Sequence, residues 1–183
     1  PSLDQARDGF ARAAEGGADA PVDYVVENHK PELLYPLTEF EVLSGIREAA
    51  EILEALEGLS HPVFDRVRTL LTDSESASAV ADAFAHVLTS TSAEDADAVA
   101  EQCALRAEAG TSPAPHSDDI VVRLNDAHPG DRGIVASLFL TPRILQPGEV
   151  MFVPAGTVHA YFSGLGVELM ANSDNVLRAG LTS

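Results

Sequence analysis

The side chain with the clearest metal-binding chemistry is His159, which follows a tight turn near the end of the chain. The apolar run 150–153 and the Pro-Ala-Gly sequence at 154–156 predict two short strands joined by that turn. The proline has no backbone N–H to donate and the glycine accepts a left-handed conformation, so the chain is able to reverse there. Strand alternation then directs His159 and Tyr161 to the same side. A lone histidine in a strand is more often structural, so the metal-binding interpretation needs a partner.

Glu32 supplies the carboxylate that such a metal site would use. Pro31 disfavours the α conformation at Lys30, so the chain around Glu32 is predicted to be extended and to lead into the apolar run 33–37. Burying a glutamate without a partner is costly, and coordination of a metal beside a histidine is one solution. The alternative is an exposed position on an edge strand.

Three further charged side chains lie near the end of the sequence. Glu168 alternates with Val167 and Leu169, so it points away from them, towards the interior of a sheet or onto a solvated strand face. Arg178 stands among apolar residues and needs a carboxylate or phosphate partner, because the planar guanidinium suits both. The alternative is an outward arginine paired with a glutamate. Asp174 lies in an Asn-Ser-Asp-Asn run that is typical of a turn.

The spacing of apolar residues predicts helices in the middle of the chain and short strands after them. Ser2 and Gln5 are predicted to cap the first helix. Residues 38–47 fit either a strand or a helix. The predicted helices are 3–14, 48–57, 61–71, 77–88, 92–107 and 120–125. The predicted strands are 135–140, 143–145, 150–153, 158–162, 167–170 and 176–181. Short strands separated by such turns favour a β-sandwich or barrel.

The composition argues against several classes of protein. With 11 Lys and Arg against 29 Asp and Glu, the 183-residue chain has a formal net charge of −18, which argues against a nucleic-acid-binding surface. Its single cysteine, Cys103, forms no intrachain disulfide, which fits a reducing compartment. No apolar run is long enough to span a bilayer. His61, His86 and Cys103 fall on separate predicted helices, and no ligand spacing connects them.

Three segments together resemble a known enzyme family. The spacing Gly-x5-Pro-x-Gly-x2-His that ends at His159 is similar to the second metal-binding motif of the cupin β-barrels, although Ser163 replaces the usual asparagine. Segments 28–33 and 168–182 resemble signatures of type I mannose-6-phosphate isomerase, a cupin, and the three segments stand in that family's order. The resemblance covers essentially the whole chain and is weakest between about residues 56 and 116.

The resemblance implies a mixed fold: a cupin-like antiparallel β-barrel or sandwich, incomplete here, with an inserted all-α helical subdomain. It makes residues 38–47 a strand. The implied cupin portions are 1–47 and 117–183, and the implied helical subdomain is 48–116. In the family, a Gln-x-His pair supplies two of the four zinc ligands and is expected directly before Pro1. The chain is therefore expected to be the central portion of a longer protein and to bind zinc poorly by itself.

The activity implied by the resemblance is the interconversion of mannose 6-phosphate and fructose 6-phosphate through an enediol, a step that leads towards GDP-mannose. The implied zinc ligands are Glu32 and His159; the implied catalytic residues are Arg178, Glu168 and Lys30; the implied substrate-binding residues are Tyr161 and Asp174. The sequence does not identify the group that abstracts the proton. The expected partner is a phosphorylated hexose, with no nucleic acid and no membrane, and the expected form is a cytoplasmic monomer.

Two other functions fit part of the pattern. A cupin-type metal-dependent oxygenase normally carries a His-x-His pair in its first motif, and this chain has none. Such an enzyme would hold iron or manganese instead of zinc. A non-catalytic sugar-binding cupin module would keep the pocket without turnover, and its ligand affinity would tolerate the loss of Arg178.

Overall fold

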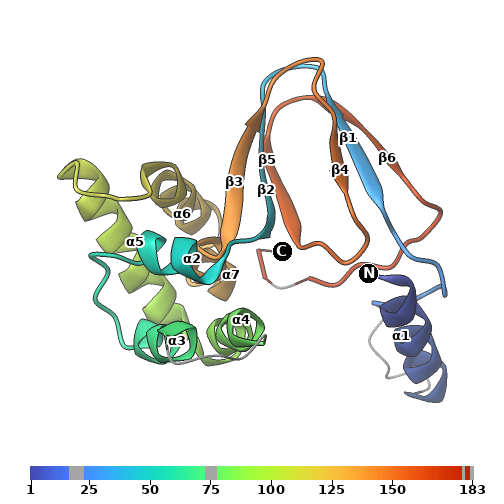
Figure 1. Cartoon of the computed structure of the whole chain (residues 1–183), viewed down its shortest axis with the longest axis horizontal. Helices are drawn as coiled ribbons and strands as arrows, with labels where there is room; N and C mark the ends of the chain where they lie inside the picture. Colours follow the sequence, from blue (N-terminus) through green and yellow to red (C-terminus); the bar gives the residue numbers. More distant parts are fainter. Residues whose placement is uncertain (17–22, 73–77, 179, 182–183) are drawn as a thin grey trace. The chain divides into compact units, whose positions relative to one another are not determined.

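Contacts divide the molecule into two compact units (Figure 1). The computed structural model describes residues 1–16, 23–72, 78–178 and 180–181. The first unit, called here the strand unit, comprises Pro1–Gly45 and Pro142–Leu177. The second, called the helical unit, comprises Ile46–Thr141 and Arg178–Ser183. Residues 117–141, which the sequence grouped with the cupin strands, make their contacts within the helical unit.

Helices and strands alternate in blocks along the described chain. The helices are α1 (Leu3–Gly16), α2 (Ala49–Ala55), α3 (Val63–Thr72), α4 (Ala79–Ser90), α5 (Ala93–Glu108), α6 (Pro115–Ala127) and α7 (Arg132–Ser137). The strands are β1 (Glu32–Pro36), β2 (Phe40–Ile46), β3 (Leu140–Leu145), β4 (Met151–Val153), β5 (His159–Ser163) and β6 (Gly166–Met170). None of these helices combines the length and the apolar character that a bilayer crossing requires.

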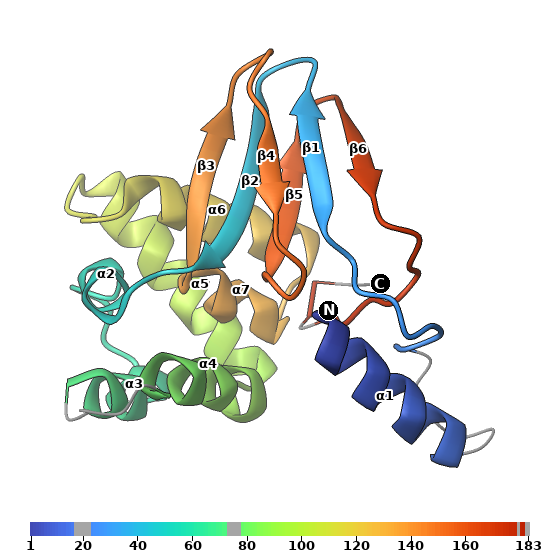
Figure 2. The same cartoon turned by 45° about the vertical axis from the view of Figure 1, so that its right-hand side comes forward.

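The strands form two small sheets, ordered β4-β1-β6 and β3-β2-β5. Figure 2 shows β1 between β4 and β6, and both of these pairings are antiparallel. Glu32 lies opposite Val153 and Met170, and Leu34 lies opposite Glu168. Directly opposed residues point to the same face of a sheet, so Glu168 shares a face with Glu32 and Leu34. Two incomplete antiparallel sheets in a mixed α and β chain confirm the predicted fold class.

The core of the strand unit joins the two sheets. Leu34, Met151 and Val153 of the first sheet and Phe40 and Val42 of the second form one buried cluster. Alternation therefore gives the first sheet an inner, buried face and an outer face.

The outer face of the first sheet is apolar and exposed. Phe152 and Leu169 both lie opposite Leu33, and Val167 lies opposite Tyr35. Phe152 is 61% exposed and Leu169 is 64% exposed. The ionisable side chains Glu32 and Glu168 of this sheet lie on its inner face.

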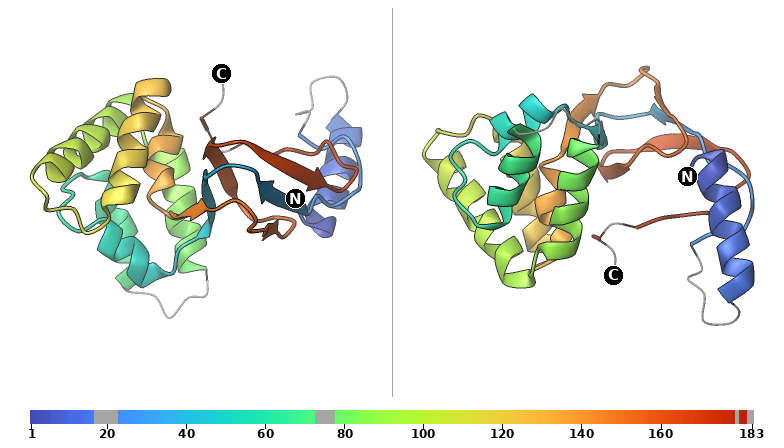
Figure 3. Two further views of the ribbon diagram at one scale, coloured as in Figure 1. Left: turned by 90° about the horizontal axis from the view of Figure 1, so that it is seen from above. Right: turned by 60° about the horizontal axis from the view of Figure 1, so that its bottom comes forward.

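The helical unit follows the predicted helix pattern closely. Ser92 begins α5 with a capping box: its hydroxyl accepts a hydrogen bond from the Asp95 N–H at 3.2 Å, and the Asp95 carboxylate accepts one from the Ser92 N–H at 2.9 Å. Helix α5 contacts α6 and α7, and α3 contacts α4. Figure 3 shows these helices from two further directions, with α5 beside α6. The alanine-rich faces allow this close packing because they place small side chains between helices.

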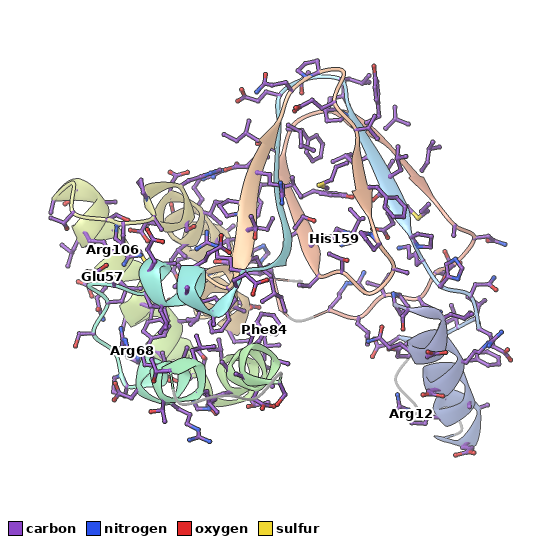
Figure 4. All side chains as sticks on the ribbon, in the orientation of Figure 1. Arg12, Glu57, Arg68, Phe84, Arg106 and His159 are labelled. Carbon is purple, nitrogen blue, oxygen red and sulfur yellow. The ribbon has the colours of Figure 1, made fainter. Side chains whose placement is uncertain are left out.

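A buried arginine ties three of these helices together. Arg106 in α5 donates two hydrogen bonds to the carboxylate of Asp118 in α6. It also donates to the backbone carbonyls of Ala55 (2.9 Å) and Glu57 (2.6 Å) at the end of α2. Figure 4 labels Arg106 and Glu57 next to each other in this unit. The guanidinium thus uses its planar set of donors to satisfy a buried carboxylate and two free helix-end carbonyls.

Two predicted strands are wrong. Residues 135–140 were expected to be a strand, but α7 covers most of that segment. The Asp131 side chain caps α7 by accepting from the Gly133 N–H at 2.6 Å, and the apolar side chains of α7 are buried against α4, α5 and α6. Packing therefore overrides the β-branched composition of this segment. Only residues from Leu140 onwards form the strand β3.

Residues 176–181 are also not a strand in the part that the structure describes. Gly180 and Leu181 have positive φ angles of 123° and 59°, which no regular strand contains. The Val176 N–H bonds to the Asp23 carbonyl at 3.1 Å instead of to a neighbouring strand. Ala179 and Thr182 lie outside the described residues.

Candidate metal centre

Glu32 is a buried carboxylate at the start of β1. Its alternation with Leu33 and its pairing with Val153 place it on the inner face, where it is 6% exposed. One of its oxygens, Oε1, lies 3.2 Å from the Lys30 Nζ. The other, Oε2, is buried and makes no hydrogen bond, although it lies 2.7 Å from the His159 Nε2. A buried carboxylate oxygen without a hydrogen-bond donor is costly, so this oxygen is the first sign of a binding site.

His159 is oriented by its neighbour in the preceding turn. Its Nδ1 lies 3.0 Å from the backbone carbonyl of Thr157, which is able only to accept. A neutral ring with this partner would carry its proton on Nδ1 and leave a lone pair on Nε2, directed at the Glu32 oxygen. At 2.7 Å this lone pair and the carboxylate oxygen would repel each other, so the pair needs a positive charge, supplied by a proton on Nε2 or by a metal ion. A backbone carbonyl on the far nitrogen is also the usual partner of a metal-binding histidine.

The turn that carries His159 requires glycine. Gly156 has φ of 91°, and a Cβ at this position would lie 3.4 Å from the Gln5 Oε1 and 3.5 Å from the Ser2 backbone nitrogen. Ser2 and Gln5 form the predicted capping box of α1, with bonds of 2.9 and 3.2 Å. The N-terminal end of α1 therefore lies close to this turn at Gly156.

Glu168 and Tyr161 extend the polar cluster along the inner face. The Tyr161 hydroxyl donates to the Glu168 Oε1 at 2.8 Å, and the rings of Tyr161 and His159 have centroids 5.3 Å apart. Burial raises the pKa of Tyr161 well above its ordinary value, and the hydrogen bond to Glu168 raises this pKa further. The Tyr161 hydroxyl therefore stays protonated and keeps donating its hydrogen bond to Glu168. Glu32, His159 and Glu168 each place one possible ligand atom within 4.8 Å of the other two.

The structure brings five of the seven predicted site residues together. They are Lys30, Glu32, His159, Tyr161 and Glu168, and Figure 4 labels His159 on the strand β5. Asp174 is exposed and lies outside the strands. Arg178 is also exposed, and its contacts assign it to the helical unit. The chemical roles of all seven remain predictions.

Sequence reasoning missed two groups that hold this site. The Thr157 carbonyl orients His159, and a backbone atom leaves no trace in residue types. Asn175 is buried and bonded to a distant segment, yet it belongs to an Asn-Ser-Asp-Asn run that resembles an ordinary turn. Residue types gave no signal for this burial, because the apolar residues that follow do not enter the interior and Leu177 is 54% exposed.

Comparisons with known proteins agree with the geometry. No protein-family model matches the chain. It is 38% identical over 177 residues to a probable mannose-6-phosphate isomerase of Caenorhabditis elegans, a match that covers 90% of this chain and 41% of that protein. Among solved structures it is similar to a mutant phosphomannose isomerase of Salmonella typhimurium, with a TM-score of 0.84, 31% identity, and coverage of 100% of this chain and 46% of the other. It is also similar to a mannose 6-phosphate isomerase bound with zinc and yttrium, with a TM-score of 0.82, 31% identity, and coverage of 100% and 46%.

These matches confirm the resemblance that the three sequence segments indicated. They extend over nearly all of this chain, while the chain spans less than half the length of the curated relatives it matches. In sequence and in fold, the chain is therefore a homologue of a portion of the mannose-6-phosphate isomerases.

Proposed function

We propose that the full-length protein containing this chain is a zinc-dependent aldose-ketose isomerase that interconverts mannose 6-phosphate and fructose 6-phosphate. The names of the relatives support the reaction, and a zinc-bound neighbour supports the metal. The observation that carries the proposal is the convergence of the Glu32 Oε2 and the His159 Nε2, 2.7 Å apart with no hydrogen bond at the carboxylate oxygen.

The donor set fits zinc. Zinc in proteins binds histidine nitrogen and carboxylate oxygen, and Glu32 and His159 would hold the ion from β1 and β5. When bound, zinc acts as a Lewis acid that polarises substrate oxygens. Because zinc takes about four ligands, two protein ligands leave positions that other protein groups, water or substrate must fill. This chain by itself is accordingly expected to bind zinc weakly.

The chain's own residues then divide the remaining tasks. The reaction moves one proton between C1 and C2 of the sugar, which requires a proton carrier within hydrogen-bond reach. We assign this role to Glu168, because Tyr161 occupies its Oε1 and leaves the Oε2 to take the proton. Lys30, already 3.2 Å from the Glu32 Oε1, is assigned to the developing oxyanion.

The phosphate and the sugar hydroxyls need further groups. We assign Arg178 to the phosphate or to the enediolate oxygens, because its guanidinium binds oxyanions through two parallel hydrogen bonds. We assign Asp174 and Tyr161 to the lining of the substrate pocket. These assignments rest on the resemblance of the 168–182 segment to the family's signature.

The proposal is tested on the full-length protein by measuring turnover of mannose 6-phosphate together with bound zinc. We expect His159→Ala to lower kcat/KM by at least about 100-fold and to remove zinc, because it deletes one ligand. The matched control is His86→Ala, which deletes a histidine of α4 in the helical unit and should change kcat/KM by less than about twofold. Unmodified protein that binds zinc but turns over no mannose 6-phosphate would refute the isomerase.

The two alternative functions predict other outcomes of the same work. A cupin oxygenase would be isolated with iron or manganese instead of zinc. A sugar-binding module would bind the sugar phosphate, show no turnover, and keep its affinity in Arg178→Ala. The isomerase predicts that Arg178→Ala loses most of its turnover, since an oxyanion contact is removed.

A further inference from the structure

We propose that Asn175 is a positioning residue that sets the place of Lys30, an inference that rests on the proposed isomerase function. Asn175 is 1% exposed, and its amide makes four hydrogen bonds to one distant backbone segment. Its Oδ1 accepts from the N–H groups of Val25 (2.7 Å) and Val26 (3.1 Å). Its Nδ2 donates to the carbonyls of Val26 (2.7 Å) and Asn28 (3.1 Å). A primary amide has two donor hydrogens and two acceptor lone pairs, and all of them are used here.

Two neighbours of Asn175 hold the same segment. The Ser173 hydroxyl donates to the Asn28 carbonyl at 3.0 Å, so that oxygen accepts from both Ser173 and Asn175. In the opposite direction, the Asn28 side chain donates to the Asn172 carbonyl at 2.9 Å. We call the groups of Asn172, Ser173 and Asn175 that make these bonds the clamp. The clamp holds the segment 25–28 by hydrogen bonds between residues that are 144 to 150 positions apart in the chain.

The segment 25–28, which the clamp holds, ends two residues before Lys30. Residues 25–28 belong to no strand, and β1 begins only at Glu32. Glu32 is held by ladder pairing to both β4 and β6, whereas Lys30 precedes the ladder by two residues and its N–H donates to the Pro1 carbonyl at 3.2 Å. The side chain of Lys30 is only 14% exposed, and its Nζ lies 3.2 Å from the Glu32 carboxylate. The position of Lys30 therefore depends on its bond to Pro1 and on the clamp, whereas the position of Glu32 depends on the ladder.

The side-chain chemistry makes Asn175 the residue to change. Asn175→Asp keeps the size and one accepting oxygen, but it replaces two donated hydrogen bonds by a second carboxylate oxygen facing the Val26 and Asn28 carbonyls. Acceptor against acceptor is repulsive, so the segment must move away. The matched control is Asn172→Asp, because Asn172 is exposed and joins the clamp only through its backbone carbonyl.

The test is a double-mutant cycle in the full-length protein, with kcat/KM and zinc content measured together. We expect Asn175→Asp to lower kcat/KM about tenfold with zinc content unchanged, and Asn172→Asp to leave both unchanged. In a Lys30→Met background, Asn175→Asp should cause less than about a twofold further loss, because the group it positions is already absent. A merely structural residue would give the same tenfold loss in both backgrounds, and that result would overturn the proposal, as would loss of zinc from Asn175→Asp.

Two further measurements keep the inference testable. If Asn175→Asp fails to fold, Ser173→Ala removes the bond to the Asn28 carbonyl and the 3.4 Å bond from the Asn175 N–H. It should give a two- to fourfold loss that again disappears with Lys30→Met. If the unmodified protein shows no isomerase turnover, the proposed function fails, but amide hydrogen exchange still tests the clamp. Exchange across residues 25–30 should accelerate at least about tenfold in Asn175→Asp and stay unchanged in Asn172→Asp. Unchanged exchange in Asn175→Asp would show that the clamp does not hold this segment.

Discussion

The two units each bury a carboxylate, and they treat it in opposite ways. In the helical unit, Asp118 is 0% exposed and accepts from Arg106 with both of its oxygens. In the strand unit, Glu32 is 6% exposed, and its Oε2 makes no hydrogen bond. That oxygen faces the His159 Nε2 across 2.7 Å. One carboxylate is fully satisfied by the protein, and the other is only half satisfied.

This difference between Asp118 and Glu32 distinguishes a carboxylate that stabilises the fold from one that is able to bind a ligand. A buried carboxylate with both oxygens bonded to a buried guanidinium has its charge balanced by the protein, so its role is to hold helices together. A buried carboxylate with a free oxygen beside a histidine lone pair keeps a binding capacity that the fold has not used. The same substitution at the two positions should therefore have different consequences.

The largest effect on stability is expected from Asp118→Asn. The amide nitrogen would face the donors of Arg106 and leave a buried guanidinium without its counter-charge, which costs about 3–5 kcal/mol. We expect this loss in the free energy of unfolding of the helical unit, measured by denaturant titration of the full-length protein. The control is Asp119→Asn, whose exposed carboxylate pairs with Arg123 on the surface. Equal stability of the two variants would show that the Arg106 pair does not support the unit.

The same exchange in the strand unit, Glu32→Gln, should act on the metal instead. An amide is a poorer zinc ligand than a carboxylate, so zinc affinity should fall by about 100-fold, or about 2.7 kcal/mol. Without metal, the free energy of unfolding should change by less than about 1 kcal/mol, because the lost pair with Lys30 is offset by removal of an unsatisfied charge. Zinc titration and denaturant titration of the metal-free protein measure the two quantities. A metal-free variant destabilised as strongly as Asp118→Asn would make Glu32 a structural residue.

The same contrast explains what the sequence was able to predict. Helices in the 48–109 region follow from local signals, such as the capping of α5 by Ser92 and Asp95. The segment of α7 is partly β-branched, and its burial against three other helices adds to the Asp131 cap in making it helical. In the site, strand alternation alone predicts that Glu168 points to the other face of the sheet from Val167 and Leu169. The contacts of Glu32 with Lys30 and His159 join separate segments, so no local pattern reports their distances.

The resemblance to a known family supplied what local patterns lack. It selected Glu32 and His159 as a pair, although they lie in different sheets and far apart in the sequence. It did not indicate the part played by Asn175, because hydrogen bonds from a buried amide to the backbone at 25–28 depend on the folded path of both segments. The sequence therefore predicts the residues of a site that could bind or react more readily than it predicts the residues that hold them in place.

An effect confined to alkaline pH is expected from the cysteine that lies beside the satisfied carboxylate. Burial and, secondarily, the charge of Asp118 raise the pKa of the Cys103 thiol from 9.0 to about 12. The folded protein thus holds this proton more tightly than the unfolded chain, so the stabilising contribution is complete below pH 9 and is lost as the pH rises towards 12.

Over that range the unfolding free energy of the helical unit should fall by about 1.4 kcal/mol per pH unit more steeply than in Cys103→Ala, which has no thiol to ionise. Parallel denaturant titrations at several alkaline pH values measure the difference between the two slopes. Identical slopes would mean that the thiol ionises as easily in the folded unit as in the unfolded chain. The buried thiol should also resist alkylation in the native protein at pH 8, since the thiolate is the reactive form.

The smallest effect is expected where the strand unit satisfies one of its own carboxylates. Tyr161→Phe removes the donor to the Glu168 Oε1 and should lower kcat about fivefold with little change in KM, because Glu168 loses its fixed orientation while the metal ligands remain. The raised pKa keeps the Tyr161 hydroxyl protonated. The ratio of kcat in the unmodified protein to kcat in Tyr161→Phe should therefore stay constant from about pH 7 to 10. Tyr35→Phe, on the exposed outer face of the same unit, is the control. A ratio that declined towards one as the pH approached 10 would mean that Tyr161 ionises like a free phenol, and the orientation of Glu168 would then need another donor.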